Sequence, residues 1–265
     1  MASWAVSPEV QLRQTRFRKK LADAWVITPG SRVLEIGCGQ GDTTAVLAHA
    51  VGENGRVTAT DIASPTYGSP VSLGDSAAHL QASPLGERID FRFGFDLLDP
   101  SMEFSDDAFD TVVMSHCSWY FPSAEVLLRT LARVRPWAKR LCFSEWKLEP
   151  DSWDQTSHML AAIIQGQLRA LDPNTLANIR TPLSKDRLKQ ILSEAGWALV
   201  DDKAIDSSGL DDAEWEIAAA LDADLSPLPV SLRETVKSQI DVLRGLSART
   251  VKRSLSSYSL VATRE

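Results

Sequence analysis

The stretch VLEIGCGQGDTT, residues 33–44, decides the fold of this chain. Its first four residues are mostly apolar and suit a short buried strand, whereas Asp42 is of a type that commonly begins a helix. Three glycines stand between them: Gly37, Gly39 and Gly41. Glycine tolerates positive φ angles, and without a side chain it lets a ligand come close to the backbone. The stretch therefore predicts a strand, a ligand-binding turn and a helix in succession.

The charges around this turn restrict the kind of ligand. A dinucleotide-binding turn has the pattern GxGxxG and holds a pyrophosphate at the start of the helix. Here Asp42 stands where the third glycine would be, and Glu35 precedes the turn. Both carboxylates would repel a phosphate at the helix start. The turn suits a ligand that carries a positive charge and no phosphate.

Acidic residues at the ends of the next two predicted strands narrow the ligand further. Asp61 follows Gly41 by twenty residues, a position from which a carboxylate can accept both ribose hydroxyls. Asp96 ends the third strand, where it could meet an adenine amino group. An adenosine with a cationic tail that lacks phosphate is S-adenosylmethionine (SAM).

These motifs, followed by FDTVVMSHCSWYF as the fourth strand and its loop, resemble those of class I SAM-dependent methyltransferases. The resemblance covers residues 31–145 well and the chain from residue 185 onward more loosely. The loop at residues 64–75 is similar to that of some small-molecule methyltransferases of microbial secondary metabolism. The resemblance implies an α/β, Rossmann-like fold: a seven-stranded, mostly parallel sheet flanked by helices, with helical insertions that form a lid.

The resemblance also implies which residues bind the cofactor. Glu35 and the turn backbone would hold the methionine part of SAM, and Asp61 would hold the ribose. The remaining positions would contact the adenine or border the sulfonium. The full predicted set, which would also bind the product S-adenosylhomocysteine (SAH), is Glu35, Gly37, Cys38, Gly39, Gly41, Asp61, Ile62, Asp96, Leu97 and Ser115.

The hydrophobic pattern along the chain predicts the other elements. An N-terminal lid helix is expected in residues 1–30, ahead of a methyltransferase domain at 31–265 with helical insertions at about 151–182 and 208–250. A capping box at Ser231 and Glu234 is expected to begin the last helix. The predicted strands are 32–36, 57–60, 89–95, 111–114, 140–144, 198–201 and 257–263. The predicted helices are 8–25, 43–51, 124–134, 153–171, 185–195, 213–221 and 232–246.

Five basic residues gather on the N-terminal helix, between Arg13 and Lys20. A solvated helix face explains such a cluster, and an anion-binding role is the alternative.

Aromatic residues crowd the segments that follow the predicted strands, where open α/β sheets bind ligands. They favour a small, flat or largely apolar methyl acceptor, although each could instead be a core anchor for the insertions. Tyr67 could cover the cofactor or simply belong to a surface loop. The predicted substrate-binding residues are Tyr67, Trp119, Tyr120, Trp146 and Trp153.

Methyl transfer requires the acceptor to be aligned with the activated methyl group, and a hydroxyl acceptor also requires a base. His116, at the end of the fourth strand, is the predicted catalytic base, and Glu145 is the second catalytic candidate, with His158 after it. A hydrogen-bonded structural role is the alternative for His116. A histidine base predicts a rate that rises with pH through one ionisation near the ordinary histidine pKa.

Composition restricts the class of partner. The 265 residues carry a net charge of −7, which argues against a nucleic-acid partner. The three cysteines are far apart in the sequence and predict neither a disulfide framework nor a metal site. The absence of an apolar leader or of a long apolar run predicts a cytoplasmic protein with no membrane partner.

Together these observations predict an enzyme that transfers a methyl group from SAM to an oxygen or nitrogen of a small aromatic or apolar metabolite. The alternative is a methyltransferase-like protein that binds SAM without methylating, as a regulatory partner or as the catalyst of another reaction such as a cyclisation. The oligomeric state is left open.

Overall fold

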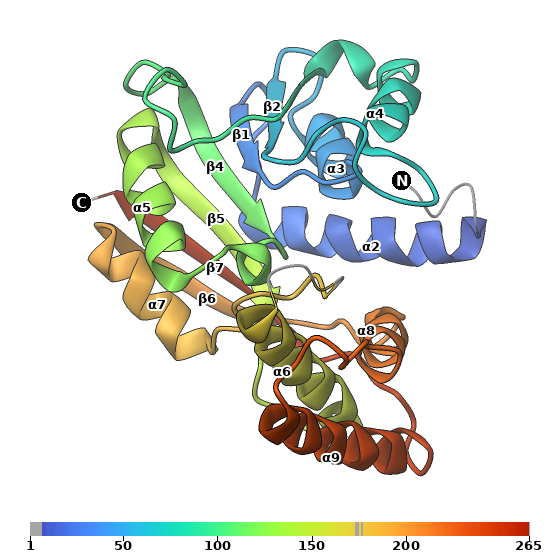
Figure 1. Cartoon of the computed structure of the whole chain (residues 1–265). Helices are drawn as coiled ribbons and strands as arrows, with labels where there is room; N and C mark the ends of the chain where they lie inside the picture. Colours follow the sequence, from blue (N-terminus) through green and yellow to red (C-terminus); the bar gives the residue numbers. More distant parts are fainter. Residues whose placement is uncertain (1–6, 173–174, 176, 265) are drawn as a thin grey trace.

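The computed structural model describes residues 7–172, 175 and 177–264. Within them, seven strands form one sheet in the order β3-β2-β1-β4-β5-β7-β6 (Figure 1). The strands are β1 (Arg32–Ile36), β2 (Arg56–Asp61), β3 (Ile89–Phe93), β4 (Phe109–Ser115), β5 (Ala138–Trp146), β6 (Trp197–Ile205) and β7 (Ser257–Arg264). Strands β1 to β5 pair in parallel, and β7 runs antiparallel to both of its neighbours. The predicted seven-stranded, mostly parallel sheet is confirmed.

The order of the strands reverses between β1 and β4, which are neighbours although β2 and β3 come between them in the chain. In open α/β sheets ligands bind beyond the carboxyl ends of the strands at such a reversal. The glycine turn follows β1 and the segment with His116 follows β4, so both predicted parts of the site lie at this edge.

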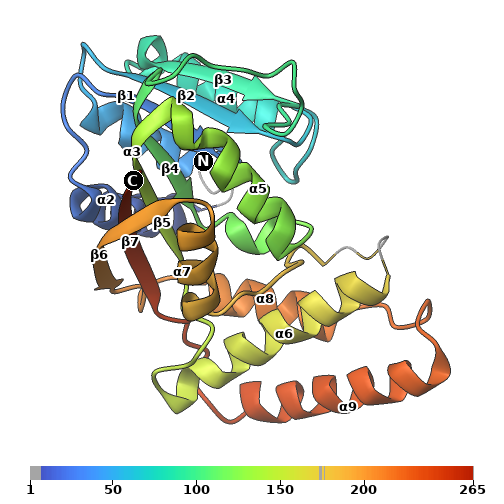
Figure 2. The ribbon, with the colours of Figure 1, turned by 90° about the vertical axis from the view of Figure 1, so that its left-hand side faces the viewer.

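Helices cover both faces of the sheet. Helices α2 (Pro8–Trp25), α3 (Asp42–Ala50) and α4 (Leu73–Gln81) lie on one face, and α5 (Ala124–Val134) and α7 (Lys185–Glu194) lie on the other (Figures 1 and 2). On the first face, Leu21 and Trp25 of α2 pack with Leu47 of α3 and are fully buried. On the second, Leu131 and Ile191 pack with the strands in a separate core.

A third group of helices lies beyond the carboxyl ends of β4 and β5, at the bottom of Figures 1 and 2. It consists of α6 (Thr156–Leu171), α8 (Asp212–Leu221) and α9 (Val230–Ser247), which share their own hydrophobic core. Both insertions of the predicted organisation are thus helical, and their role as a lid stays a prediction. No helix among the described residues is long and apolar enough to cross a membrane.

Two local predictions were wrong. The sequence indicated a loop as far as residue 75, but Ser72 caps α4, its hydroxyl accepting a hydrogen bond from the backbone N–H of Asp75 at 3.1 Å. The capping box at Ser231 does not form, because α9 begins earlier, at Val230, with Pro229 in the capping position. Pro229 has the extended ψ of a residue that precedes a helix, so the helix starts two residues before the predicted start at residue 232.

Candidate active site

The three glycines of the turn after β1 serve different purposes. All have positive φ, of 71° at Gly37, 51° at Gly39 and 84° at Gly41. A Cβ atom at Gly37 would lie 2.7 Å from the Cβ of Cys117, and one at Gly41 would lie 2.6 Å from the side chain of Leu80. At Gly39 no atom of the described residues lies within 4 Å of such a Cβ. Packing therefore requires Gly37 and Gly41, whereas Gly39 borders open space that a ligand can enter.

Asp61 ends β2 and faces this turn. Its Oδ2 accepts a hydrogen bond from the backbone N–H of Gly39 at 2.9 Å, and its Oδ1 accepts one from Ala63 at 2.9 Å. The next side chain, Ile62, is 71% exposed. A carboxylate beside an exposed apolar surface is the combination that a nucleoside requires, since the ribose offers hydroxyl donors and the base offers a flat ring.

The segment that follows β3 contributes fewer available side chains to the predicted cofactor site. Asp96 is exposed, and its Oδ1 accepts a hydrogen bond from the backbone N–H of Leu98 at 2.9 Å, which leaves the other oxygen open to solvent. Leu97 is buried in the core on the α5 face of the sheet. Its side chain is therefore occupied by packing.

Glu35 lies beneath the turn and is buried, with its Oε2 accepting a hydrogen bond from the Thr44 hydroxyl at 2.6 Å. Burial raises the pKa of Glu35 to about 8, partly opposed by the Thr44 hydrogen bond. A ligand cation placed nearby would favour the charged carboxylate. Cys38 lies above it, and burial raises the pKa of its thiol, so the thiol is inert and only its backbone can take part.

His116 follows β4 in a backbone conformation with φ of 50°, and its N–H donates to the carbonyl of Ser144 at 2.8 Å. Its ring lies against two aromatic rings, 5.4 Å from the centre of Phe17 and 4.6 Å from that of Trp146. Ser115, half-buried at the end of β4, has its Oγ 3.4 Å from His116 Nδ1. The histidine is thus enclosed between the sheet and α2.

The hydrogen bonds of His116 assign its protons. Its Nε2 lies 3.1 Å from Ser257 Oγ, and that hydroxyl donates to the carbonyl of Glu145 at 3.2 Å. This donation favours the tautomer with the ring proton on Nε2, in which Nδ1 is the nitrogen able to take a proton. Burial lowers the pKa of His116 well below its ordinary value. If His116 is the base, the pH at which the rate increases should therefore lie below the ordinary histidine pKa.

Glu145, at the end of β5, is buried and engaged with the backbone. Its Oε2 accepts hydrogen bonds from the N–H and the hydroxyl of Ser118, at 3.0 and 2.7 Å, and its Oε1 accepts one from the N–H of Trp146 at 3.0 Å. Burial raises the pKa of Glu145 to about 7, opposed by these hydrogen bonds. The carboxyl group holds the short 3₁₀ helix η2 (Ser118–Tyr120) against the sheet.

The predicted substrate-binding aromatics fall into two groups. Trp119 and Trp146 are buried: Trp119 donates to the carbonyl of Leu183 at 3.2 Å, and Trp146 stacks on Phe17. Both therefore anchor the insertion and α2 to the sheet. The exposed aromatics are Tyr67, Tyr120 and Trp153.

The loop that carries Tyr67 contacts the glycine turn, because Gln40 Nε2 of the turn donates a hydrogen bond to the carbonyl of Val71 at 2.8 Å. The Tyr67 hydroxyl donates a long, 3.5 Å hydrogen bond to Asn178 Oδ1, which joins the loop before α4 to the segment after α6. Trp153 begins a 3₁₀ turn, is 68% exposed and makes no ring contact with the described aromatic residues. The structure therefore does not bring Trp153 together with the other predicted residues.

Polar side chains that the sequence did not single out face the space beyond β4. On α8, Asp212 accepts a hydrogen bond from Gln14 of α2 at 3.1 Å, and Glu216 accepts one from Gln165 of α6. Arg18 lies on α2 next to Phe17. We call Gln14, Arg18, Tyr120, Gln165, Asp212 and Glu216 the helical side of the site, and Glu35, Gly37–Gly41, Asp61, Ile62 and Asp96 the glycine-turn side. Of this helical side, the sequence singled out Tyr120 as a substrate-binding residue and included Arg18 in the basic cluster, whereas the two acids four residues apart on α8 were not assigned a role.

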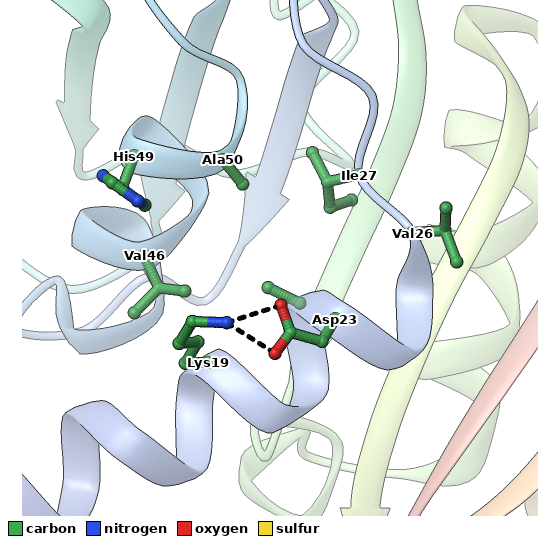
Figure 3. A pocket seen from close by; sticks show the side chains of 8 residues that line it. Lys19, Asp23, Val26, Ile27, Val46, His49 and Ala50 are labelled. Carbon is green, nitrogen blue, oxygen red and sulfur yellow. Dashed lines mark hydrogen bonds and ion pairs between the residues drawn. The ribbon is translucent and has the colours of Figure 1, made fainter.

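A separate pocket of about 420 Å³ lies between α2 and α3, on the outer side of α2 (Figure 3). A salt bridge of 2.6 Å between Lys19 and Asp23 crosses its rim. None of the predicted site residues lines it; the lining residues are Lys19, Ala22, Asp23, Val26, Ile27, Val46, His49 and Ala50.

Among the described residues, no three His, Cys, Asp or Glu side chains are grouped so that they could hold a metal ion. A family model described as a methyltransferase domain matches residues 10–202, which include the glycine turn, Asp61 and His116. The chain belongs to the class I SAM-dependent methyltransferase family. SAM is the cofactor of this family, and the open space at Gly39 beside Asp61 and Ile62 fits it.

Three relatives illustrate how this methyltransferase compares with known proteins. Methyltransferase phomM′ of Diaporthe leptostromiformis is 31% identical over 206 residues, which are 63% of this chain and 53% of phomM′. The chain therefore spans about half the length of that relative. The ubiquinone/menaquinone biosynthesis C-methyltransferase UbiE of Vibrio cholerae is 31% identical over 64% of this chain and 65% of its own.

The third is a solved structure, the cyclopropane-fatty-acyl-phospholipid synthase-like protein of Lactobacillus casei. It is 38% identical with a TM-score of 0.86 and covers 96% of this chain and 92% of its own. The similarity extends over the helical insertions as well as the sheet, because nearly the whole chain is matched.

Proposed function

We propose that this methyltransferase transfers the methyl group of SAM to an oxygen or nitrogen of a small aromatic or apolar metabolite. The observation that carries the proposal is the contact between α2 and α8 beyond the carboxyl ends of β4 and β5. Arg13 pairs with Asp211, and Gln14 donates to Asp212. A site covered by two cross-linked helices admits a small molecule more readily than a nucleic acid or a folded protein.

The glycine-turn side would hold SAM, with Asp61 at the ribose, Ile62 and Asp96 at the adenine and the turn backbone with Glu35 at the methionine part. Bound SAM supplies a methyl group already activated for displacement by its sulfonium. The chain's task is then to orient the acceptor and keep water out. The buried aromatic cluster of Phe17, Trp146 and His116 supports the exclusion of water, since their rings close the sheet edge under α2.

For a hydroxyl acceptor we propose that His116 takes the proton at Nδ1, on the Ser115 side of the ring. The neutral state of His116 supports this role, because a base must be unprotonated when the acceptor binds. Glu145 stays the second candidate. Its carboxyl oxygens already accept three hydrogen bonds, so a positioning role through η2 suits it better than proton transfer.

The names of the relatives broaden the acceptors to be tested. UbiE is named as a C-methyltransferase of ubiquinone and menaquinone biosynthesis. A quinol, in which a ring carbon could accept the methyl group, is therefore one of the acceptors to be tested. The name of the Lactobacillus casei protein makes a fatty-acyl phospholipid another acceptor to be tested. The charged groups on the helical side support a small acceptor that presents a hydroxyl or an amine over one with a long acyl chain.

The proposal is tested by incubating the protein with methyl-labelled SAM and four classes of acceptor: phenols, quinols, aromatic amines and fatty-acyl phospholipids. Label transferred to a phenol, quinol or amine, and absent with Gly39→Val, supports the proposal. Transfer to the phospholipid alone would contradict the small acceptor. Tight SAH binding without transfer to any acceptor, including a metabolite extract, would instead support the alternative of a non-methylating catalyst or regulatory partner.

A further inference from the structure

The N-terminal helix α2 carries one arginine that points inward. Arg18 is half-buried, and its Nη1 is fully buried without a hydrogen-bond partner in the part of the chain that the structure describes. Its neighbours on the helix are paired: Arg13 with Asp211, Lys19 with Asp23 and Lys20 with Asp206. The basic cluster is therefore mostly a solvated, ion-paired face, and Arg18 differs from the rest.

The position of Arg18 on α2 follows from helical spacing. Leu21 and Trp25 form a fully buried stripe of α2 that packs on the sheet. Arg18 continues this stripe by one helical turn toward the carboxyl ends of the strands. One turn further along the same side, Gln14 bonds Asp212 of α8, and Gln11 bonds Asp42 at the start of α3 at 2.8 Å. Arg18 thus lies over the strand ends, between the glycine turn and α8.

The charges around Arg18 agree with this placement. Burial raises the pKa of Glu35 and of Asp212, and the positive charge of Arg18 opposes the rise in both. The guanidinium therefore acts on both sides of the site, yet it forms no ion pair or hydrogen bond with either carboxylate. A buried cationic donor without an acceptor is costly, and such groups in proteins are normally paired.

We propose that Arg18 binds the carboxylate of the amino-acid tail of the cofactor, as a positioning residue of the SAM site. The inference rests on the proposed function, because it requires SAM at the glycine turn with its methionine part toward α2. A guanidinium and a carboxylate form charge-assisted hydrogen bonds, and the planar guanidinium group can bind both oxygens at once. The same chemistry would suit an anionic group on the acceptor, so the test must separate the two sources.

The test is calorimetric binding of two ligands: SAH, and decarboxylated SAH, which keeps the nucleoside, the sulfur and the amine. The wild-type protein is expected to bind SAH about 10- to 100-fold more tightly than the decarboxylated compound. Arg18→Gln should lower the SAH affinity by a similar factor and leave the decarboxylated compound within about twofold. Arg18→Lys should recover part of the SAH affinity, because it restores the charge without the planar geometry.

Arg16→Gln is the matched control, since Arg16 is exposed on the same helix and its loss changes the net charge equally. It should leave both affinities unchanged. Unchanged SAH affinity in Arg18→Gln, or equal losses for the two ligands, would overturn the inference; the first result would point to the acceptor as the anion. A wild-type protein that binds neither ligand would overturn the proposed function itself.

Melting of the free protein provides a second readout. Arg18→Gln removes a half-buried guanidinium whose buried Nη1 has no hydrogen-bond partner among the described residues, so its melting temperature should equal or exceed that of the wild type. A lower melting temperature would show that Arg18 supports the fold and would contradict the inference.

Discussion

The glycine-turn side and the helical side of the site are built by contacts of very different range. On the glycine-turn side, Asp61 bonds Gly39 across 22 positions of the chain, within one strand–helix–strand unit. On the helical side, Gln14 bonds Asp212 across 198 positions, and Gln165 bonds Glu216 across 51. The first arrangement leaves a recognisable motif because its parts keep a fixed spacing, whereas the second can be made by many different sequences. We therefore propose that the glycine-turn side binds the cofactor and that the helical side selects the acceptor.

The largest expected effect concerns His116, which lies where the two sides meet. His116→Asn keeps a residue type that tolerates positive φ but removes the nitrogen that can take a proton. Turnover with a hydroxyl acceptor should fall about 10²- to 10⁴-fold while the SAH affinity stays nearly constant.

His158→Asn is the matched control, because His158 is buried against the same Trp146 ring. It should retain most of the turnover. Equal losses in the two variants would assign His116 a structural role, and a joint loss of SAH affinity would make it a cofactor ligand. Any inflection of the wild-type rate that is due to His116 should lie below the ordinary histidine pKa, because burial lowers the pKa of this residue.

The second prediction breaks the glycine-turn side alone. Gly39→Val places a branched side chain in the open space at the turn and should lower SAH affinity more than about 100-fold. Gly30→Val is the matched control: Gly30 also has positive φ and nothing within 4 Å, but it lies in the turn before β1 at the opposite end of the strand. Both variants should lose about 1–3 kcal/mol of stability from backbone strain, and only Gly39→Val should lose binding. Equal SAH affinities would show that the turn does not bind the cofactor.

The third prediction concerns the ribose. Asp61→Ala should cost about 2–4 kcal/mol of SAH affinity, since two charge-assisted hydrogen bonds are lost. Because Asp61 also accepts the N–H of Gly39, the neutral variant Asp61→Asn separates the charge from the support of the turn. Asp90→Asn, an exposed position on β3, is the control and should bind normally. Calorimetry that gives the same dissociation constant for Asp61→Ala and the wild type would mean that the acid at the end of β2 is misassigned.

A comparison of the predicted and observed elements shows which parts of the fold could be predicted from the sequence. Strand β1 and helix α2 were predicted to the residue, because apolar periodicity, Pro8 and Gly30 set their ends. Helix α4 was missed, since it follows a stretch rich in Ser, Pro and Gly and its cap at Ser72 looks like part of that loop. Arg18 and Asp212 could not be assigned to the site, because their significance comes from helices brought together only in the folded chain.

The smallest effect is on stability. Glu35 has a raised pKa of about 8, so the free folded protein binds more protons than the unfolded chain between about pH 4.5 and 8. Stability from this group is therefore lost as pH rises through that window, by at most about 1.4 kcal/mol per pH unit. Glu35→Gln should remove this pH dependence. The difference between its melting temperature and that of the wild type should therefore shift in favour of the variant as the pH rises from 5 to 8. Glu87→Gln, at an exposed site, should follow the wild type. A parallel pH dependence in Glu35→Gln and the wild type would contradict the raised pKa.

The central claim is that the glycine turn and Asp61 form a site for SAM and not for a dinucleotide. Calorimetric titration of the wild-type protein with SAH and, separately, with NAD tests it most directly. The account predicts saturable binding of SAH with a stoichiometry of one per chain and no binding of NAD, because Asp42 and Glu35 place negative charge where a pyrophosphate would lie. Tight NAD binding in the absence of SAH binding would contradict it.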